Sequence, residues 1–272
     1  MENKKIAIIG CGNLGLSILN GLLEKQTIHP SNIIATRRNI KSLDHLKDKG
    51  ITTSNDNVSA INQADIIIVA LKPYNILELL KELNPYFIEG KHTLVSLATG
   101  ISLAQIQNVV KANIPIYRAM PNTAADVSTS MTCICTNSTN QEATDAVTQC
   151  FNSVGNTIII NEVLMESATV LGACGIAFVL RFIRGMIQGG IEIGFDAKTA
   201  KDIVTHTVKG AAELLIKRNE HPEFEIDKVT TPKGCTIAGL NEMEHNGFSS
   251  ALIKGIVTSF EKIEIKTPTN KK

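Results

Sequence analysis

The sequence predicts an α/β protein whose N-terminal part is a doubly wound, mostly parallel sheet and whose C-terminal part is all helical. Two observations predict this fold class. Up to residue 160, short apolar runs of β type alternate with amphipathic helical patterns, and the runs are apolar almost throughout, as in strands that are buried on both faces. Beyond Asn161 the β-type runs stop and a helical period takes over. We therefore expect two domains, 1–161 and 162–272.

Seven runs in the first part have the composition of strands, being short, rich in Ile, Val and Leu, and separated by helical patterns. They are Lys5–Ile9, Asn32–Thr36, Ile66–Ala70, Thr93–Leu97, Ile114–Arg118, Met131–Thr136 and Thr157–Ile160. Between them, Leu14, Ile18 and Leu22 recur at four-residue spacing, and a second apolar stripe lies within Ile76–Leu83. Such alternation is typical of a parallel sheet with helices on its faces.

Four helical patterns make up the C-terminal third. They are Glu162–Phe195, Lys198–Lys217, Thr236–His245 and Ser249–Lys266. The first is apolar over most of its circumference, and a helix of that kind must be buried against other helices or a second subunit. We therefore expect the C-terminal domain to be a dimerisation domain, and the chain to form a homodimer or a larger homo-oligomer.

Composition excludes several classes of protein. The 27 Lys and Arg nearly balance the 26 Asp and Glu, aromatic residues are 4 % and Trp is absent, so we expect no nucleic-acid partner. The longest apolar stretch near the middle of the chain, Ser167–Leu180, has 14 uncharged residues, fewer than the roughly 18–20 that a bilayer span needs, so we expect no membrane partner. The six cysteines show no CxxC pair and no metal-like spacing, which favours a cytoplasmic protein without a metal site.

A GxGxxG motif follows the first expected strand and opens a helix. Gly10 permits a tight turn, Gly12 allows the backbone to approach a pyrophosphate, and Gly15 allows the helix to pack closely on the strand. The phosphates would lie on the free N–H groups at the helix N-terminus. The motif in this context predicts a Rossmann-type dinucleotide-binding domain.

The end of the second strand indicates which dinucleotide binds. A protein that selects NAD usually has Asp or Glu there, to hold the ribose 2′-OH. This sequence instead has Arg37 and Arg38, whose guanidinium groups suit a 2′-phosphate. We therefore predict NADPH as the cofactor, with NADH possible but weaker.

Further motifs carry a family resemblance. They are Val69-Ala-Leu-Lys-Pro73, Ser96-Leu-Ala-Thr-Gly100, Arg118-Ala-Met-Pro-Asn-Thr123 and Val229-Thr-Thr-Pro-Lys-Gly-Cys-Thr-Ile-Ala-Gly-Leu240. Together with the N-terminal glycines, this series resembles pyrroline-5-carboxylate reductase from about residue 5 to about residue 264. The resemblance implies reduction of 1-pyrroline-5-carboxylate, a small-molecule substrate, to L-proline by hydride transfer to the C=N carbon, the last step of proline biosynthesis.

The resemblance and the glycine motif also imply site residues. For the cofactor they are Ile9, Gly10, Gly12, Asn13, Leu14, Gly15, Thr36, Arg37, Arg38, Asn57, Ala70, Leu71, Lys72, Pro73, Ser96, Leu97, Ala98, Met120 and Asn122. For the substrate they are Glu162, Thr231, Gly234, Cys235 and Thr236, of which Thr236 is the candidate catalytic residue. The loop Thr231–Thr236 precedes a helical pattern, so its amides and hydroxyls suit a carboxylate.

Two alternatives stay open at this point. One is a different NADPH-dependent reductase of the same two-domain plan, acting on another imine or a 3-hydroxy acid; the 3-hydroxy acid enzymes typically carry a Lys on the long helix, where Gly172–Phe182 offers only Arg181. The other is a catalytically silent regulatory protein that binds NADPH. It is favoured only by Gly172–Phe178, where the hydroxyls, proline and phenol usual in the resembled family are replaced.

Overall fold

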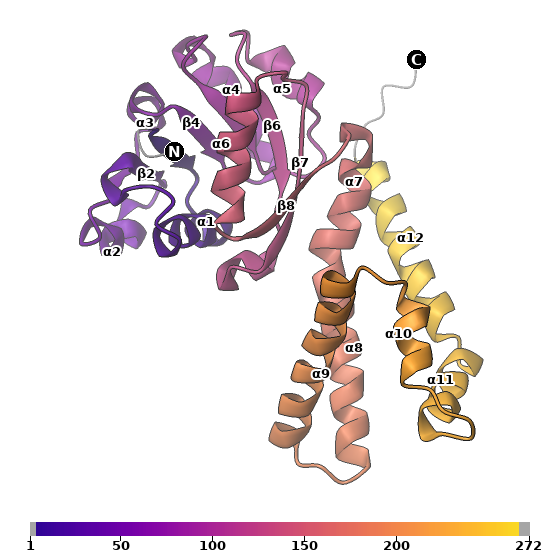
Figure 1. The fold of residues 1–272 in the computed structure, drawn as a ribbon. Helices are drawn as coiled ribbons and strands as arrows, with labels where there is room; N and C mark the ends of the chain where they lie inside the picture. Colours follow the sequence, from indigo (N-terminus) through magenta and orange to yellow (C-terminus); the bar gives the residue numbers. More distant parts are fainter. Residues whose placement is uncertain (1–3, 267–272) are drawn as a thin grey trace, which may run out of the picture. The chain divides into compact units, whose positions relative to one another are not determined.

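The computed structural model describes residues 4–266 (Figure 1). The chain divides into two compact units. One comprises the residues up to Cys174 together with the chain from Phe260 onward, and the other is Gly175–Ser259. The first contains the sheet and the second is entirely helical, so the predicted fold class is confirmed.

The sheet has eight strands in the order β3-β2-β1-β4-β5-β6-β7-β8, and every neighbouring pair is parallel except β6 and β7. The strands are β1 Ile6–Ile9, β2 Ile33–Thr36, β3 Thr52–Ser54, β4 Ile66–Val69, β5 Thr93–Ser96, β6 Ile116–Met120, β7 Ser130–Thr136 and β8 Gly155–Ile159. The seven expected strands are all present, within two residues at each end. β3 was not predicted, because this three-residue edge strand is polar and only partly buried.

Each central strand supplies side chains to two cores, one on either face of the sheet. On one face Ile6 and Ile8 pack with apolar residues of α1, α2 and α6. On the other, Ala7 and Ile9 pack with those of α3, α4 and α5. This alternation explains why the strands are apolar almost throughout. The helices are α1 Asn13–Glu24, α2 Asp44–Lys47, α3 Asn57–Gln63, α4 Pro73–Leu83, α5 Leu103–Val109 and α6 Gln141–Asn152.

The sequence predicted that residues 162–174 begin one regular helix, and this prediction was wrong. They form a 3₁₀ turn Glu162–Leu164, the short helix α7 Met165–Ala168 and a π-helical segment Thr169–Cys174. Met165 and Val170 are fully buried in the first unit. By packing, the division therefore falls after Cys174 rather than at the expected boundary of 161 and 162, because these turns contribute to the core of the sheet.

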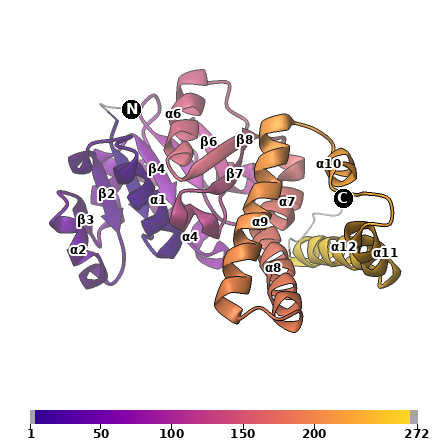
Figure 2. The same cartoon turned by 60° about the horizontal axis from the view of Figure 1, so that its bottom comes forward.

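The helical unit contains α8 Gly175–Glu192, α9 Ala197–Arg218, α10 Pro222–Lys228 and α11 Cys235–His245, with most of α12 Phe248–Lys266. Figure 2 shows α8 and α9 packed side by side. The sequence missed α10, a seven-residue helix that His221 caps by accepting the N–H of Glu223 at 3.3 Å. Because α10 is polar over most of its circumference, its sequence shows no apolar stripe with a helical period.

The apolar surface of this unit is largely uncovered within the chain. Among the described residues of α8 none is buried, and Leu180 is 58 % exposed. By length and composition alone, the helical stretch Glu162–Glu192 could cross a membrane, and 17 % of its most apolar window is buried. One such helix is weak support for a span, since an interface helix has the same composition.

A buried histidine at the amino end of β5 makes stability depend on pH. His92 is 1 % exposed, its Nδ1 accepts the N–H of Ile88 at 3.0 Å, and its Nε2 has no hydrogen-bond partner among the described residues. Burial, with help from Lys91, lowers the pKa of His92 below its ordinary value of 6.5. The unfolded state therefore binds a proton at a pH where the folded state does not.

We accordingly expect the free energy of unfolding to be highest above pH 6.5 and to decrease as pH falls below it, until the folded-state pKa of His92 is passed. His92→Gln should be less stable at neutral pH but should lose less stability on acidification. Urea titrations of both proteins at several pH values measure this difference. Parallel pH profiles for the two proteins would show that His92 does not cause the effect.

Candidate active site

The loops that follow five parallel strands meet at the carboxyl edge of the sheet. β1 is followed by the glycine turn, β2 by Arg37 and Arg38, and β4 by the loop into α4. β5 and β6 end next to one another, at Ser96 and Met120. In a doubly wound sheet this edge holds the ligand, and the switch point lies where the strand order reverses at β1.

The glycine turn after β1 has the geometry that a pyrophosphate requires. Gly10 has φ +81°, and a Cβ there would collide with the side chain of Leu71. Gly12 is the N-cap of α1, with no side-chain cap, and the first turn of the helix contains no acidic residue. Since the first helical N–H bond is that of Leu16 to Gly12 O at 2.8 Å, the preceding amides lack helical partners and can bind an anion.

Packing explains the third glycine and the cysteine of the turn. A Cβ on Gly15 would lie 3.2 Å from Cγ2 of Ile8, a tight contact that glycine avoids where helix and strand approach closely. Cys11 is fully buried, and burial raises the pKa of its thiol to about 12, against an opposing effect of Arg37. Cys11 is therefore a neutral packing group at physiological pH.

The end of β2 combines a buried hydroxyl with two unpaired cations. Thr36 Oγ1 donates to Asn57 Oδ1 at 2.6 Å, which ties β2 to the start of α3. The N–H of Arg37 donates to Ser54 O at 3.1 Å, which fixes the backbone where the arginines emerge. Within residues 4–266 the guanidinium groups of Arg37 and Arg38 make no ion pair or hydrogen bond, so both are free to bind an anionic group.

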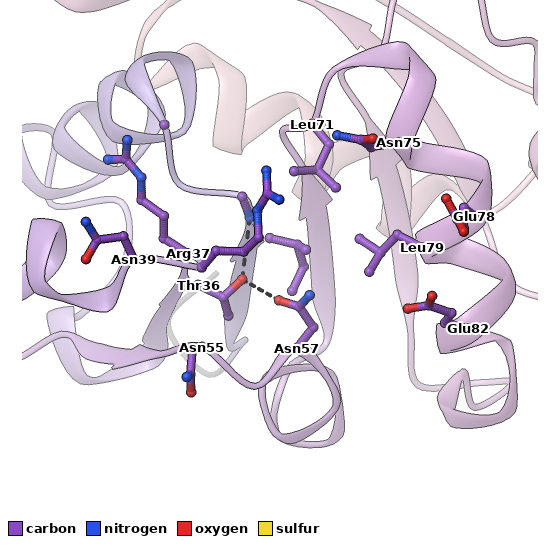
Figure 3. Close-up of a pocket in the computed structure, with 14 residues that line it drawn as sticks. Thr36, Arg37, Asn39, Asn55, Asn57, Leu71, Asn75, Glu78, Leu79 and Glu82 are labelled. Carbon is purple, nitrogen blue, oxygen red and sulfur yellow. Dashed lines mark hydrogen bonds between the residues drawn. The ribbon is translucent and has the colours of Figure 1, made fainter.

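These features enclose a pocket of about 690 Å³ (Figure 3). Eight residues predicted for the cofactor line it: Ile9, Gly10, Gly12, Thr36, Arg37, Arg38, Asn57 and Leu71. Figure 3 shows Thr36 and Asn57 on one wall, with Leu71 and Leu79 opposite. Six lining residues were missed: Asn39, Asn55, Asn75, Glu78, Leu79 and Glu82. No sequence motif marks them, because Asn39 and Asn55 lie in the loops after β2 and β3 and the other four lie on α4.

The remaining cofactor candidates do not line this pocket. Asn13, Leu14 and Gly15 lie in the first turn of α1, and Ala70, Lys72 and Pro73 lie between the end of β4 and the start of α4. Ser96, Leu97 and Ala98 follow β5, where Ser96 Oγ accepts the N–H of Ala98 at 3.3 Å. Met120 ends β6 and accepts from Thr99 Oγ1 at 3.8 Å. All of them lie along the same carboxyl edge of the sheet.

Asn122 joins two segments just beyond β6. Its side chain accepts the N–H of Ala124 at 3.0 Å and donates to Gly172 O at 3.1 Å. Gly172 lies in the π-helical segment, where the altered hydrogen-bond pattern leaves room for such an added donor. The stretch that differs from the resembled family therefore begins in a segment that Asn122 holds against the sheet.

The loop that the sequence predicts to bind the substrate, Thr231–Thr236, lies in the helical unit, at the start of α11. Gly234 is the N-cap, without a side-chain cap, and its N–H donates to Thr231 O at 2.9 Å. A Cβ on Gly234 would collide with Thr231, and Lys233 has φ +60°. Cys235 and Thr236 occupy the first turn, whose open amides suit a carboxylate.

Glu162 has protein partners that the sequence did not indicate. Its Oε1 accepts the N–H of Leu103 at 2.6 Å and lies 3.1 Å from Nη1 of Arg118. Arg118 is 3 % exposed, and its Nη2 contacts Glu166 Oε1 at 2.8 Å. A carboxylate held by two donors within the first unit has less capacity for a substrate amine than a free one, which the resemblance alone did not reveal.

Two family models match most of the chain. The model described as pyrroline-5-carboxylate reductase dimerisation matches residues 162–265, and the model described as NADP oxidoreductase coenzyme F420-dependent matches residues 5–100. The dimerisation model begins at the boundary that the sequence predicted for the second domain.

Curated relatives and a solved structure agree with these models. Pyrroline-5-carboxylate reductase 1 of Dictyostelium discoideum is 44 % identical over 94 % of this chain, which spans about half (49 %) of that relative. Pyrroline-5-carboxylate reductase 2 of the same organism is 42 % identical, over 96 % of this chain and 92 % of the relative. The crystal structure of Plasmodium falciparum pyrroline carboxylate reductase with NADP bound superposes with a TM-score of 0.87, at 27 % identity, over 97 % of this chain and 98 % of that chain.

The matches cover nearly the full length of both this chain and several of these relatives. The chain belongs to the pyrroline-5-carboxylate reductase family.

Proposed function

We propose that this chain reduces 1-pyrroline-5-carboxylate to L-proline with NADPH. The observation that carries the proposal is the pocket at the carboxyl edge of the sheet, where an uncapped helix start and two unpaired arginines are close together. The family of the chain supplies the substrate class.

The residues present fit an NADPH molecule at this edge. The positive φ of Gly10 and the open amides of α1 would hold the pyrophosphate, and Arg37 and Arg38 would hold the 2′-phosphate by charge-assisted hydrogen bonds. Bound NADPH supplies the hydride that adds to the C=N carbon. NADH lacks the 2′-phosphate, so it would bind more weakly.

The helical unit would position the substrate. The amides at the start of α11 and the hydroxyl of Thr231 would bind the carboxylate, and Thr236 would hydrogen-bond the ring nitrogen. A cyclic imine accepts hydride more readily when its nitrogen is protonated. Because a threonine hydroxyl is a poor acid, that proton comes from water or from substrate that binds already protonated.

Loss of NADPH absorbance after addition of 1-pyrroline-5-carboxylate tests this function. We expect stoichiometric oxidation of NADPH and formation of L-proline by the purified chain. Turnover of a 3-hydroxy acid or another imine in its place would identify a different reductase. Binding of NADPH without oxidation in the presence of any of these substrates would identify a regulatory protein.

We also propose that the chain self-associates through its helical unit. The exposed apolar side chains of α8 and α9, such as Leu180 and Ile203, need a cover, and a second copy of the dimerisation segment provides one without lipid. In detergent-free buffer, light scattering should give at least twice the monomer mass of 29.4 kDa. A stable monomer at micromolar concentration would contradict the proposal.

We propose a cytoplasmic location, supported by six cysteines that are all free thiols. A fluorescent fusion distributed with cytoplasmic markers is the expected result, and accumulation in an organelle would contradict it.

A further inference from the structure

A charged cluster built around a buried arginine lies on the face of the sheet that α5 and α7 cover. Its members are Arg118 of β6 with Glu162 and Glu166, which stand one turn apart at the beginning of the segment that follows the sheet. The guanidinium contacts one oxygen of each carboxylate, at 3.1 and 2.8 Å. Among the described residues, Arg118 Nε and Glu166 Oε2 are buried without a hydrogen-bond partner.

Burying the charged groups of this cluster costs desolvation free energy that their mutual attraction need not recover. The guanidinium of Arg118 is buried, while the side chains of Glu162 and Glu166 are 33 % and 21 % exposed. In place of a buried guanidinium and its ion pairs, well-packed apolar residues would often stabilise a protein at least as well. Unsatisfied buried polar atoms are also rare in folded proteins. The charges therefore point to a role in fixing a particular arrangement of segments.

The cluster lies next to both ends of the Ser96–Ser102 loop and includes the turns that follow the sheet. Arg118 lies opposite Ser96 in the register of β6 and β5, so it stands beside the start of the Ser96–Ser102 loop. Glu162 holds the other end of that loop, because its Oε1 accepts the N–H of Leu103, the first residue of α5. Glu162 and Glu166 also anchor the turns that lead into the π-helical segment, which Asn122 holds through Gly172 O at 3.1 Å.

These segments lie at one end of the cofactor edge. In a doubly wound sheet the adenosine half of a dinucleotide lies over β1 and β2, and the nicotinamide half lies over the strands beyond the switch point, here β4 to β6. We propose that Arg118, acting through Glu162 and Glu166, is a positioning residue for the reaction: it sets the Ser96–Ser102 loop and the Thr169–Cys174 segment at the nicotinamide end of the site. The inference rests on the proposed function for its cofactor.

The first test needs no cofactor. In Glu162→Ala, amide hydrogen exchange at Leu103 should become at least about tenfold faster, since its acceptor is gone. Glu162→Gln keeps a carbonyl acceptor and should restore much of the protection. Arg118→Met should also accelerate exchange at Leu103, because Glu162 loses its anchor. Unchanged exchange at Leu103 in Arg118→Met would overturn the claim that Arg118 acts through Glu162.

The second test compares the two halves of the cofactor in the absence of substrate. Arg118→Met and Glu162→Ala should bind 2′,5′-ADP, the adenosine half, within about twofold of the unmodified chain, while the fluorescence of the bound nicotinamide of NADPH changes. His92→Gln, a buried polar residue at the amino end of β5, is the matched control for general destabilisation. Equal loss of 2′,5′-ADP affinity in Arg118→Met and the control would show a merely structural role.

Kinetics complete the test. We expect Glu162→Ala to lower kcat for 1-pyrroline-5-carboxylate by about tenfold or more with a small change in KM, because misplacement of the nicotinamide affects the chemical step. A raised KM with unchanged nicotinamide fluorescence would instead mean that Glu162 touches the substrate, and would overturn the proposal. If the unmodified chain binds NADPH but does not reduce pyrroline carboxylate, only the proposed function fails, since exchange and fluorescence are measured without substrate.

Discussion

Arg37→Asp is expected to weaken NADPH binding far more than NADH binding. The guanidinium of Arg37 lines the pocket, has no partner among the described residues and follows the strand end where the ribose 2′ position is recognised. Loss of a charge-assisted hydrogen bond costs about 1–3 kcal/mol, which is roughly 5- to 150-fold in Kd. The introduced carboxylate would also repel a 2′-phosphate, while it could accept a hydrogen bond from the 2′-OH of NADH. Fluorescence titrations with both cofactors measure the Kd of NADPH and of NADH, and the ratio of the two is compared between Arg37→Asp and the unmodified chain.

Lys41→Asp is the matched control for this change. It alters the charge equally a few residues further along the chain, in the 3₁₀ turn Ile40–Leu43, but it does not line the pocket. We expect it to change both affinities slightly and in a salt-dependent manner. An equal loss of NADPH and NADH affinity in Arg37→Asp would mean that Arg37 does not bind the 2′-phosphate.

Thr236→Ala is expected to lower kcat/KM for 1-pyrroline-5-carboxylate by roughly 10- to 100-fold, which corresponds to one hydrogen bond to a charged group worth about 1.5–3 kcal/mol. Thr236 lies in the first turn of α11, in the helical unit. The phosphates of the cofactor would lie at Gly10–Gly15 in the other unit, so NADPH affinity should not change. Steady-state kinetics and an NADPH titration measure the two effects separately.

Two further variants test whether the hydroxyl of Thr236, rather than its methyl group, supports the reaction. Thr236→Ser keeps the hydroxyl and should recover most of the activity. Thr230→Ala removes a hydroxyl from the same region, but one that donates locally to Ile226 O at 2.8 Å, so its effect on kcat/KM should be small. Full activity of Thr236→Ala would show that the hydroxyl of Thr236 does not bind the substrate. The ring nitrogen would then need another hydrogen-bond donor.

Much of the N-terminal unit was predictable from local patterns. A strand buried on both faces must be apolar along its length, so Ile6–Ile9 and Ile66–Val69 were evident as strands. The glycine turn was equally evident, because Gly10 at φ +81° is required by backbone geometry alone. In contrast, β3 and α10 are short and polar, so neither has an apolar pattern that would indicate it.

The lining of the pocket shows the same limit. Asn57 and Leu71 were expected from the family resemblance, whereas Asn75, Glu78 and Glu82 had no motif to mark them. They line the pocket because α4 packs its Ile76 and Leu80 face on the sheet and thereby turns another face toward the cofactor edge. Only the packed helix determines which of its polar residues border the site.

The sequence by itself determined the fold class, the glycine turn that would bind a pyrophosphate and the two arginines that stand in place of an acid. Each of these depends on residues close together in the chain, whose pattern is dictated by backbone geometry or burial. The tertiary structure decided the partners of Glu162, the π-helical segment and the packing of residues 162–174 on the sheet. These depend on Arg118, Leu103 and Asn122, which lie some 40 to 60 positions away in the chain, and contacts at that separation leave no periodic signal in the sequence.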